Sequence, residues 1–127
     1  MVVKILVPTA GPEPARINAS RIVNIAKNFD AQLIVVHIRD QGESRGEGDQ
    51  ALDIFSRLAL ANGVEHKLVP AIGEISSTII GQARFHEVDL ILMGATEGRG
   101  VAGWIMDRIM SSVDVPVLIL PWSAKTD

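Results

Sequence analysis

The chain has 127 residues, of which 47% are hydrophobic and 21% are charged, and this mixture fits one globular domain with a core of its own. Its formal net charge is −3 and it has no long basic run, which argues against DNA or RNA as a partner. The absence of cysteine excludes disulfides, thiolate metal sites and a cysteine nucleophile. No apolar run approaches the ~20 residues of a membrane span. The N-terminus enters a strand-like run without a signal peptide, so we expect a cytoplasmic protein.

Short apolar runs rich in Val, Ile and Leu alternate with segments of helical spacing along the whole chain. In chain order, the expected strands are Val2–Pro8, Leu33–Ile38, Glu65–Ala71, Asp89–Met93 and Val115–Leu120. The expected helices cover about residues 15–29, 51–61, 73–83 and 104–113, with inward positions such as Ala19, Phe29, Phe55, Ile79 and Ile109. Residues 39–49 are rich in glycine and charge, and they are expected to form an exposed loop.

This alternation predicts an α/β fold with an open parallel sheet, right-handed crossovers and helices on both faces. In sheets of this kind, ligands bind beyond the carboxyl ends of the strands, where the strand order reverses. The turn at Thr9–Gly11 and the loop at Gly94–Gly103 both follow predicted strands. We therefore expect a ligand site between these two segments.

The Gly94–Gly103 loop has four glycines in ten residues, between a strand and a helix. Glycine permits a close approach of the backbone, and the helix that follows adds free N–H groups, so the loop is suited to bind phosphate. Gly98 to Gly103 matches G-x-G-x-x-G, but it follows the fourth strand, and Leu118 occupies the position where a dinucleotide site needs an acid. The alternative is a crossover loop without a ligand.

Other chemistry-bearing residues give weaker signals. His37, His66 and His86 have no metal-ligand spacing, and a hydrogen-bonded structural role is the expectation even for His37 at the predicted ligand edge. Met93, Met106 and Met110 are expected to fill gaps in the core. No catalytic residue and no metal site is predicted.

Several segments in their order and spacing resemble the universal stress protein family from end to end. They are Ile5–Pro8, Val36–Ile38, Gly73-Glu74, Asp89–Gly94 and Val115–Ile119. The resemblance implies a Rossmann-like domain over residues 1–122, followed by a tail at residues 123–127. It also implies a five-stranded parallel sheet in the order 3-2-1-4-5, a homodimer and, in many members, bound ATP.

The ATP-binding members carry G-x2-G-x9-G-[ST] after the fourth strand, and this chain departs from that pattern. Glu97 occupies the second glycine position, the loop is about four residues shorter when Gly103 is matched to the last glycine, and Trp104 replaces the hydroxyl residue. Ala10 replaces an acid that contacts the ribose or base side in such members. The site residues that the resemblance implies are Pro8, Thr9, Ala10, Val36, Met93, Gly94, Gly98, Gly100, Gly103 and Trp104. Trp104 is expected to pack against its neighbours, or alternatively to fill the phosphate space.

The last predicted strand indicates a partner. Pro116 cannot donate to a ladder, so it favours an edge strand, and an open apolar edge invites pairing. Pairing with a second copy through Val113, Val115, Val117 and Ile119 would cover this edge, as the family resemblance also implies. The alternative is a monomer whose edge is shielded by residues 121–127.

These observations give three hypotheses about function. The first is a homodimeric regulatory stress-response protein that acts by binding partners and has a degenerate ATP site. The second is an ATP- or AMP-binding switch, with adenine near Thr9 and Val36 and phosphates over Gly94–Gly103. The third, an ATP-hydrolysing enzyme, has no identifiable base or metal cluster. The chain is also compatible with a regulatory domain of a transporter.

Overall fold

The computed structural model describes residues 2–39, 42, 45–95 and 103–121. Strands and helices alternate strictly along the chain, as expected from the sequence. Their bounds are β1 (Lys4–Thr9), α1 (Pro12–Asn28), β2 (Gln32–Arg39), α2 (Arg45–Ala61), β3 (His66–Ile72), α3 (Ile75–His86), β4 (Leu90–Gly94), α4 (Gly103–Ser112) and β5 (Val117–Leu120). The predicted tail at residues 123–127 lies outside the described residues.

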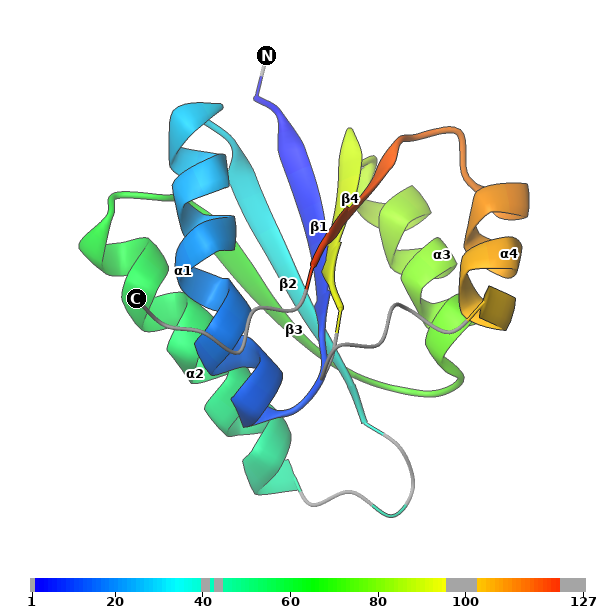
Figure 1. Ribbon diagram of the computed structural model, residues 1–127, viewed down its shortest axis with the longest axis horizontal. Coiled ribbons are helices and arrows are strands. Elements are labelled where there is room, and N and C mark those ends of the chain that lie inside the picture. Colours follow the sequence, from blue (N-terminus) through cyan, green and yellow to red (C-terminus); the bar gives the residue numbers. More distant parts are fainter. Residues whose placement is uncertain (1, 40–41, 43–44, 96–102, 122–127) are drawn as a thin grey trace.

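The five strands form one parallel sheet in the order β3-β2-β1-β4-β5, which confirms the predicted fold and topology. Helices α1 and α2 cover one face of the sheet, and α3 and α4 cover the other (Figure 1). Alternate residues of the central strands therefore enter two separate cores, because both faces of the sheet are buried. Leu33 and Val35 of β2 belong to the core under α1 and α2, whereas Ile34 and Val36 belong to the core under α3 and α4.

The two edge strands differ in their exposure and in their length. β3 pairs with β2 over seven positions and carries Pro70 in its interior, so it has one N–H fewer to offer to a further strand. β5 is short and begins directly after Pro116, as the edge-strand prediction requires. Its side chains are only partly covered: Val117 and Ile119 pack against the core under α3 and α4, and Leu118 is exposed.

The largest difference from the sequence-based expectation lies at the start of α2. The sequence predicts a loop over residues 39–49, but the helix begins at Arg45 and includes Gly46 and Gly48. Glycine usually weakens a helix interior, which is why the sequence pattern favours a loop. Gly48 is buried against the His37 imidazole, and a Cβ atom there would lie 2.9 Å from His37 Nε2. Close packing of the helix on β2 therefore explains this glycine.

Two side chains that were predicted to be inward are exposed, and a third lies beyond the end of its helix. Phe29 ends α1 as its C-cap and is exposed, because the helix stops before its last predicted turn is complete. Met110 is 60% exposed on α4, so its prediction as a core residue was wrong, whereas Met93 is buried and Met106 half-buried, as expected. Val113 lies just beyond α4, although it still packs against the core under α3 and α4.

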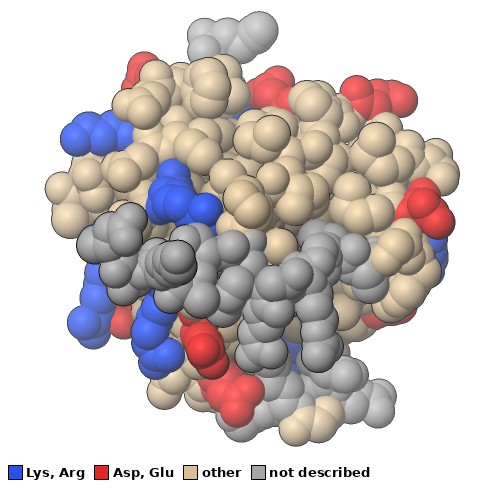
Figure 2. All heavy atoms as spheres, in the orientation of Figure 1, with Lys and Arg blue, Asp and Glu red and all other residues tan. Residues whose placement is uncertain are grey.

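Charged side chains are spread over the surface. In the view of Figure 2, Lys and Arg lie mostly over α1 and α2, and tan and red atoms separate them. Among the described residues drawn on that face, no continuous basic patch forms. None of the helices in the described part of the chain is both long enough and apolar enough to cross a membrane.

Candidate functional site

The candidate site lies at the carboxyl ends of β1 and β4. The chain leaves β1 toward β2 and β3 on one side, and it later returns to β4 and β5 on the other side, so the strand order reverses at β1. β1 pairs with both β2 and β4. A crevice beyond the strand ends at such a reversal is where open α/β sheets bind ligands. The structure therefore brings Thr9 and Ala10 of the first loop close to Gly94 at the end of β4, as expected.

The first loop is held by a buried histidine from the neighbouring strand. His37 is opposite Thr9 in the β1–β2 register, and its Nδ1 lies 3.0 Å from the Thr9 carbonyl and 3.1 Å from the Ala10 carbonyl. Because both partners are acceptors, Nδ1 carries the proton and donates. This confirms the prediction that His37 is a hydrogen-bonded structural residue, and it fixes the backbone at Ala10.

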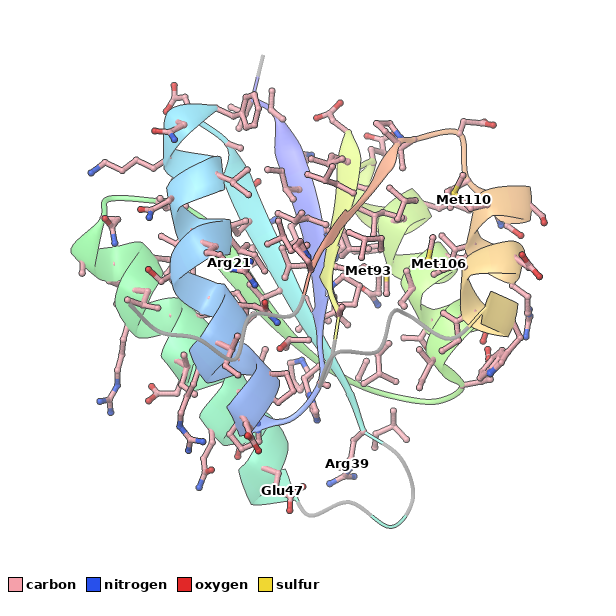
Figure 3. The ribbon with its side chains drawn as sticks, in the orientation of Figure 1. Arg21, Arg39, Glu47, Met93, Met106 and Met110 are labelled. Atoms are coloured by element: carbon pink, nitrogen blue, oxygen red, sulfur yellow. The ribbon has the colours of Figure 1, made fainter. Side chains whose placement is uncertain are left out.

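The end of β4 is built around a close contact with α1. Asn18 is only 5% exposed, and a Cβ atom at Gly94 would lie 2.7 Å from its Cγ. Arg21, one turn further along α1, donates from one guanidinium nitrogen to Asn18 Oδ1 at 2.6 Å and to the Pro121 carbonyl at 3.0 Å. Figure 3 shows Arg21 on the side of α1 that faces the sheet. Glycine at position 94 is therefore explained by packing, whether or not a ligand is bound.

Little space remains beneath the contact between Asn18 and Gly94. Pro8, Thr9, Ala10, Asn18 and Gly94 line a cavity of about 30 Å³, about the volume that one water molecule occupies in the liquid. A nucleotide would therefore have to lie outside this cavity, beyond the strand ends. The Val36 side chain is 1% exposed and belongs to the core under α3 and α4, and Met93 is buried in the same core. Contacts from these two residues would have to come from backbone atoms.

Helix α4 follows the loop that the family resemblance assigns to the phosphates. Gly103 is its first residue, and a Cβ atom there would meet no heavy atom within 4 Å, so packing within the described residues does not require this glycine. Trp104 is 55% exposed, so its indole is only partly covered by neighbouring residues. Glu97, Gly98 and Gly100 lie outside the described residues. The described start of α4 thus presents an indole at the position where the ATP-binding pattern has a hydroxyl.

Glu74 caps the neighbouring helix α3 and joins it to α4. Its carboxylate accepts hydrogen bonds from the Ser77 N–H at 2.7 Å, from the Ser76 hydroxyl at 2.6 Å and from the Ser76 N–H at 3.2 Å. Arg108 of α4 lies 3.5 Å from the same carboxylate. The Ser76 hydroxyl, followed by the backbone N–H of Ser77, lowers the pKa of Glu74 to about 2. Anionic Glu74 thus satisfies N–H groups at the start of α3 and leaves fewer of them for a ligand.

We expect Glu74→Gln to destabilise the protein at neutral pH and to lose its effect in acid. Because folding lowers this pKa from 4.5 to about 2, anionic Glu74 stabilises the folded state above about pH 4.5, and this contribution is lost as the pH falls toward 2. Urea unfolding at pH 7, 5 and 3 measures the difference between wild type and variant. Glu65→Gln, at an exposed carboxylate of the same type, is the control. An equal difference at all three pH values would contradict the assignment.

The other histidines have local roles away from the crevice. His66 Nε2 lies 3.0 Å from the Ser56 hydroxyl, and its Nδ1 lies 3.2 Å from the Val64 carbonyl. His86 contacts Gln82 on α3, and its pKa is lowered by burial and then by the charges of Lys67 and Lys4. Within the described ranges, no three His, Cys, Asp or Glu residues are grouped to hold a metal.

Sequence reasoning missed the residues that shape the crevice from below. Asn18 lies between Ala15 and Ala19 on the inner face of α1, and a polar residue on that apolar face was a signal that it supports something. The role of Arg21 depends on Pro121, one hundred residues away, and no local pattern indicates such a contact. The sequence placed the start of α3 at Gly73-Glu74 correctly, but it did not indicate that the Glu74 side chain caps the helix, because Ser, Thr, Asp and Asn are the usual N-caps.

The sheet order and the crevice at its reversal define a Rossmann-like α/β protein with a ligand edge at β1 and β4. The family model of the universal stress protein family matches residues 1–121. The chain therefore belongs to the universal stress protein family, as the sequence resemblance implied. Among curated proteins, it is 27% identical to universal stress protein MJ0531 of Methanocaldococcus jannaschii over 137 residues, covering 92% of this chain and 81% of that protein.

Solved structures of the family share the fold at low sequence identity. A universal stress protein in complex with cAMP aligns with a TM-score of 0.75 and 21% identity, covering 96% of this chain and 98% of that one. The Archaeoglobus fulgidus protein in complex with dAMP aligns with a TM-score of 0.69 and 14% identity, over 94% and 97% of the two chains. An Arabidopsis thaliana family protein with AMP bound aligns with a TM-score of 0.70 and 15% identity, over 96% and 93%. These likenesses establish the architecture.

Proposed function

We propose that this protein is a homodimeric, cytoplasmic stress-response regulator that acts by binding partners and whose adenine-nucleotide site is weakened for ATP. The observation that carries the proposal is the pair of exposed side chains at two positions that the ATP-binding pattern uses. Ala10 presents an exposed methyl group, and Trp104 presents an exposed indole. Ala10 has no carboxylate to accept a hydrogen bond, and Trp104 lacks the hydroxyl of the ATP-binding pattern and carries a much bulkier ring whose one donor is the indole N–H.

The expected energetic effect of these replacements is large relative to an ordinary nucleotide affinity. A hydrogen bond to a charged group contributes about 1.5–3 kcal/mol, and each 1.4 kcal/mol changes the dissociation constant about tenfold. Glu97 adds a negative charge to the loop that would face the phosphates. Two missing bonds and this charge together would move a micromolar ATP site to millimolar affinity. The proposal requires no catalytic step.

The second candidate function is an AMP- or ATP-binding switch, and one described residue favours it. Gly103 opens α4 although packing does not require a glycine there, so its free space suits a ligand that approaches the N–H groups of the helix. Relatives with the same fold were solved with cAMP, dAMP and AMP. A monophosphate would also be less affected by a shortened phosphate loop than a triphosphate.

Two measurements on the purified full chain separate these candidates. Protein is denatured, and the released small molecules are identified by mass spectrometry; ATP and AMP are then titrated by calorimetry. We expect no stoichiometric ATP and no micromolar ATP binding. Co-purified ATP, or a micromolar dissociation constant for it, would sink the weakened-site proposal, and tight binding of AMP alone would favour the monophosphate switch.

A further inference from the structure

A second pocket lies at the same end of the sheet but on the side of α2. It is formed between the ends of β2 and β3 and the first turns of α2, and it has a volume of about 410 Å³. This volume lies within the roughly 300–1,000 Å³ typical of small-molecule sites. We call it the α2 pocket and define it by His37, Arg39, Asp49, Leu52, Pro70 and Ile72. Of the residues that define the pocket, His37 is the one that also contacts the loop at Ala10.

The shape of the pocket follows from the strand register and from one glycine. His37 is opposite Pro70, and Arg39 is opposite Ile72, so these four side chains share the face of the sheet that α2 covers. Gly48 lies directly over His37 and adds no side chain of its own to the space. His37 is 3% exposed and its Nδ1 is fixed by the Thr9 and Ala10 carbonyls, so the inner wall is rigid.

The lining has two chemical parts. Leu52 and Pro70 provide apolar surface, and Ile72 at the mouth is 65% exposed, which is costly for a large aliphatic side chain without a partner. Arg39 and Asp49 bring one positive and one negative charge to the same pocket. Figure 3 shows Arg39 leaving the end of β2 toward the first turn of α2, where Glu47 adds a second acid.

This combination selects among classes of ligand. A simple anion would pair with Arg39 but would be repelled by Asp49 and Glu47, and a simple amine would leave Arg39 without a charged ligand group. A zwitterion places a carboxylate on Arg39 and an ammonium on Asp49, and an aliphatic side chain covers Leu52, Pro70 and Ile72. We propose that the α2 pocket binds a small amino-acid-like zwitterion with an apolar side chain. This inference does not depend on the proposed nucleotide site.

The test uses the full chain labelled with ¹⁵N and three probes of the same carbon skeleton: L-leucine, 3-methylbutylamine and 4-methylpentanoate. Binding is followed by NMR, as changes in the ¹H and ¹⁵N chemical shifts of backbone amides. We expect leucine to produce saturable chemical-shift changes centred on Gly48, Asp49 and Ile72. We also expect it to bind at least about tenfold more tightly than either probe with one charge. Arg39→Met and Asp49→Asn should each weaken leucine binding about tenfold or more. The spectra also report whether each variant is folded.

The matched controls lie on the same helix. Asp53 and Arg57 form an exposed ion pair with an N–O distance of 2.8 Å, one and about two turns beyond Asp49, and neither lines the pocket. Arg57→Met and Asp53→Asn therefore make the same chemical changes outside it. We expect leucine binding to be unchanged in both. The proposal is overturned if leucine gives no saturable shift up to about 10 mM, a range in which a ligand of this size still binds measurably. Equal binding of the amine or the carboxylate, or equal weakening by the control variants, would also overturn it.

Discussion

Replacing Ala10 by aspartate and Trp104 by serine is expected to tighten adenine-nucleotide binding by about one to two orders of magnitude. The aspartate places a carboxylate on the loop that His37 holds through the Thr9 and Ala10 carbonyls, so little reorganisation is needed. The serine removes an exposed indole from the start of α4 and adds a hydroxyl near the N–H groups of that helix. Calorimetric titration with AMP and ATP measures the gain relative to wild type.

Two variants separate the carboxylate charge and the hydroxyl group from simple changes of shape. Ala10→Asn has nearly the same shape as Ala10→Asp but no charge, and Trp104→Ala removes the indole without adding a hydroxyl. We expect both to give much smaller gains. If the Asp/Ser double variant binds neither nucleotide more tightly than wild type, or if Ala10→Asn gives the same gain as Ala10→Asp, the lack of a carboxylate and a hydroxyl is not what weakens the crevice.

Leu118→Lys is expected to convert a dimer of this protein into a monomer. β5 is an edge strand, and Leu118 is 45% exposed on it. Under two-fold symmetry a lysine on a self-paired strand would face its own copy across a short distance, and like charges juxtaposed in an interface cost several kcal/mol, or a factor of at least about 100 in the dissociation constant. Sedimentation equilibrium over a range of concentrations measures the change.

The choice of Leu118 follows from packing. Val113, Val115, Val117 and Ile119, which the sequence indicated as interface residues, all pack against the core under α3 and α4, so a charge there would also disturb the fold. Leu60→Lys is the matched control. Leu60 is the same residue type and is 70% exposed, and it lies on α2, which connects β2 to β3 at the side of the sheet opposite β5. A dimer that persists in Leu118→Lys, or a wild-type protein that sediments as a monomer, would reject pairing through β5.

The sequence was sufficient for the architecture because its strongest signals were long and periodic. Short runs such as Leu33–Ile38 are almost entirely apolar, as expected of a strand buried on both faces, and their alternation with helical segments favours a parallel sheet. The order of the strands came from the resemblance to a family. Helix ends were less accurate, because Gly46 and Gly48 weaken a helix locally while Gly48 allows it to pack on His37.

The candidate site could be located from the sequence but not constructed from it. Strand ends and glycines indicated the correct edge, since a parallel sheet brings the ends of β1 and β4 together. Contacts that tie the surrounding elements together join residues far apart in sequence, such as Arg21 with Pro121 and Glu74 with Arg108. Periodicity gives no information on such pairs. It also could not show that Trp104 points outward, because an apolar residue at a helix start is compatible with either orientation.

Pro70 has a consequence for how many copies of this chain can associate. It lies in the interior of β3, the edge opposite β5, and it leaves that edge with one missing donor; the same strand also carries the exposed Lys67. A sheet with two receptive edges could add copies at both ends and grow into a fibre. Pro70 opposes addition at the β3 edge, and the two-fold pairing through β5 that we propose would occupy the β5 edge in both partners. Association through β5 would therefore stop at two copies, at concentrations where an open-ended sheet would polymerise.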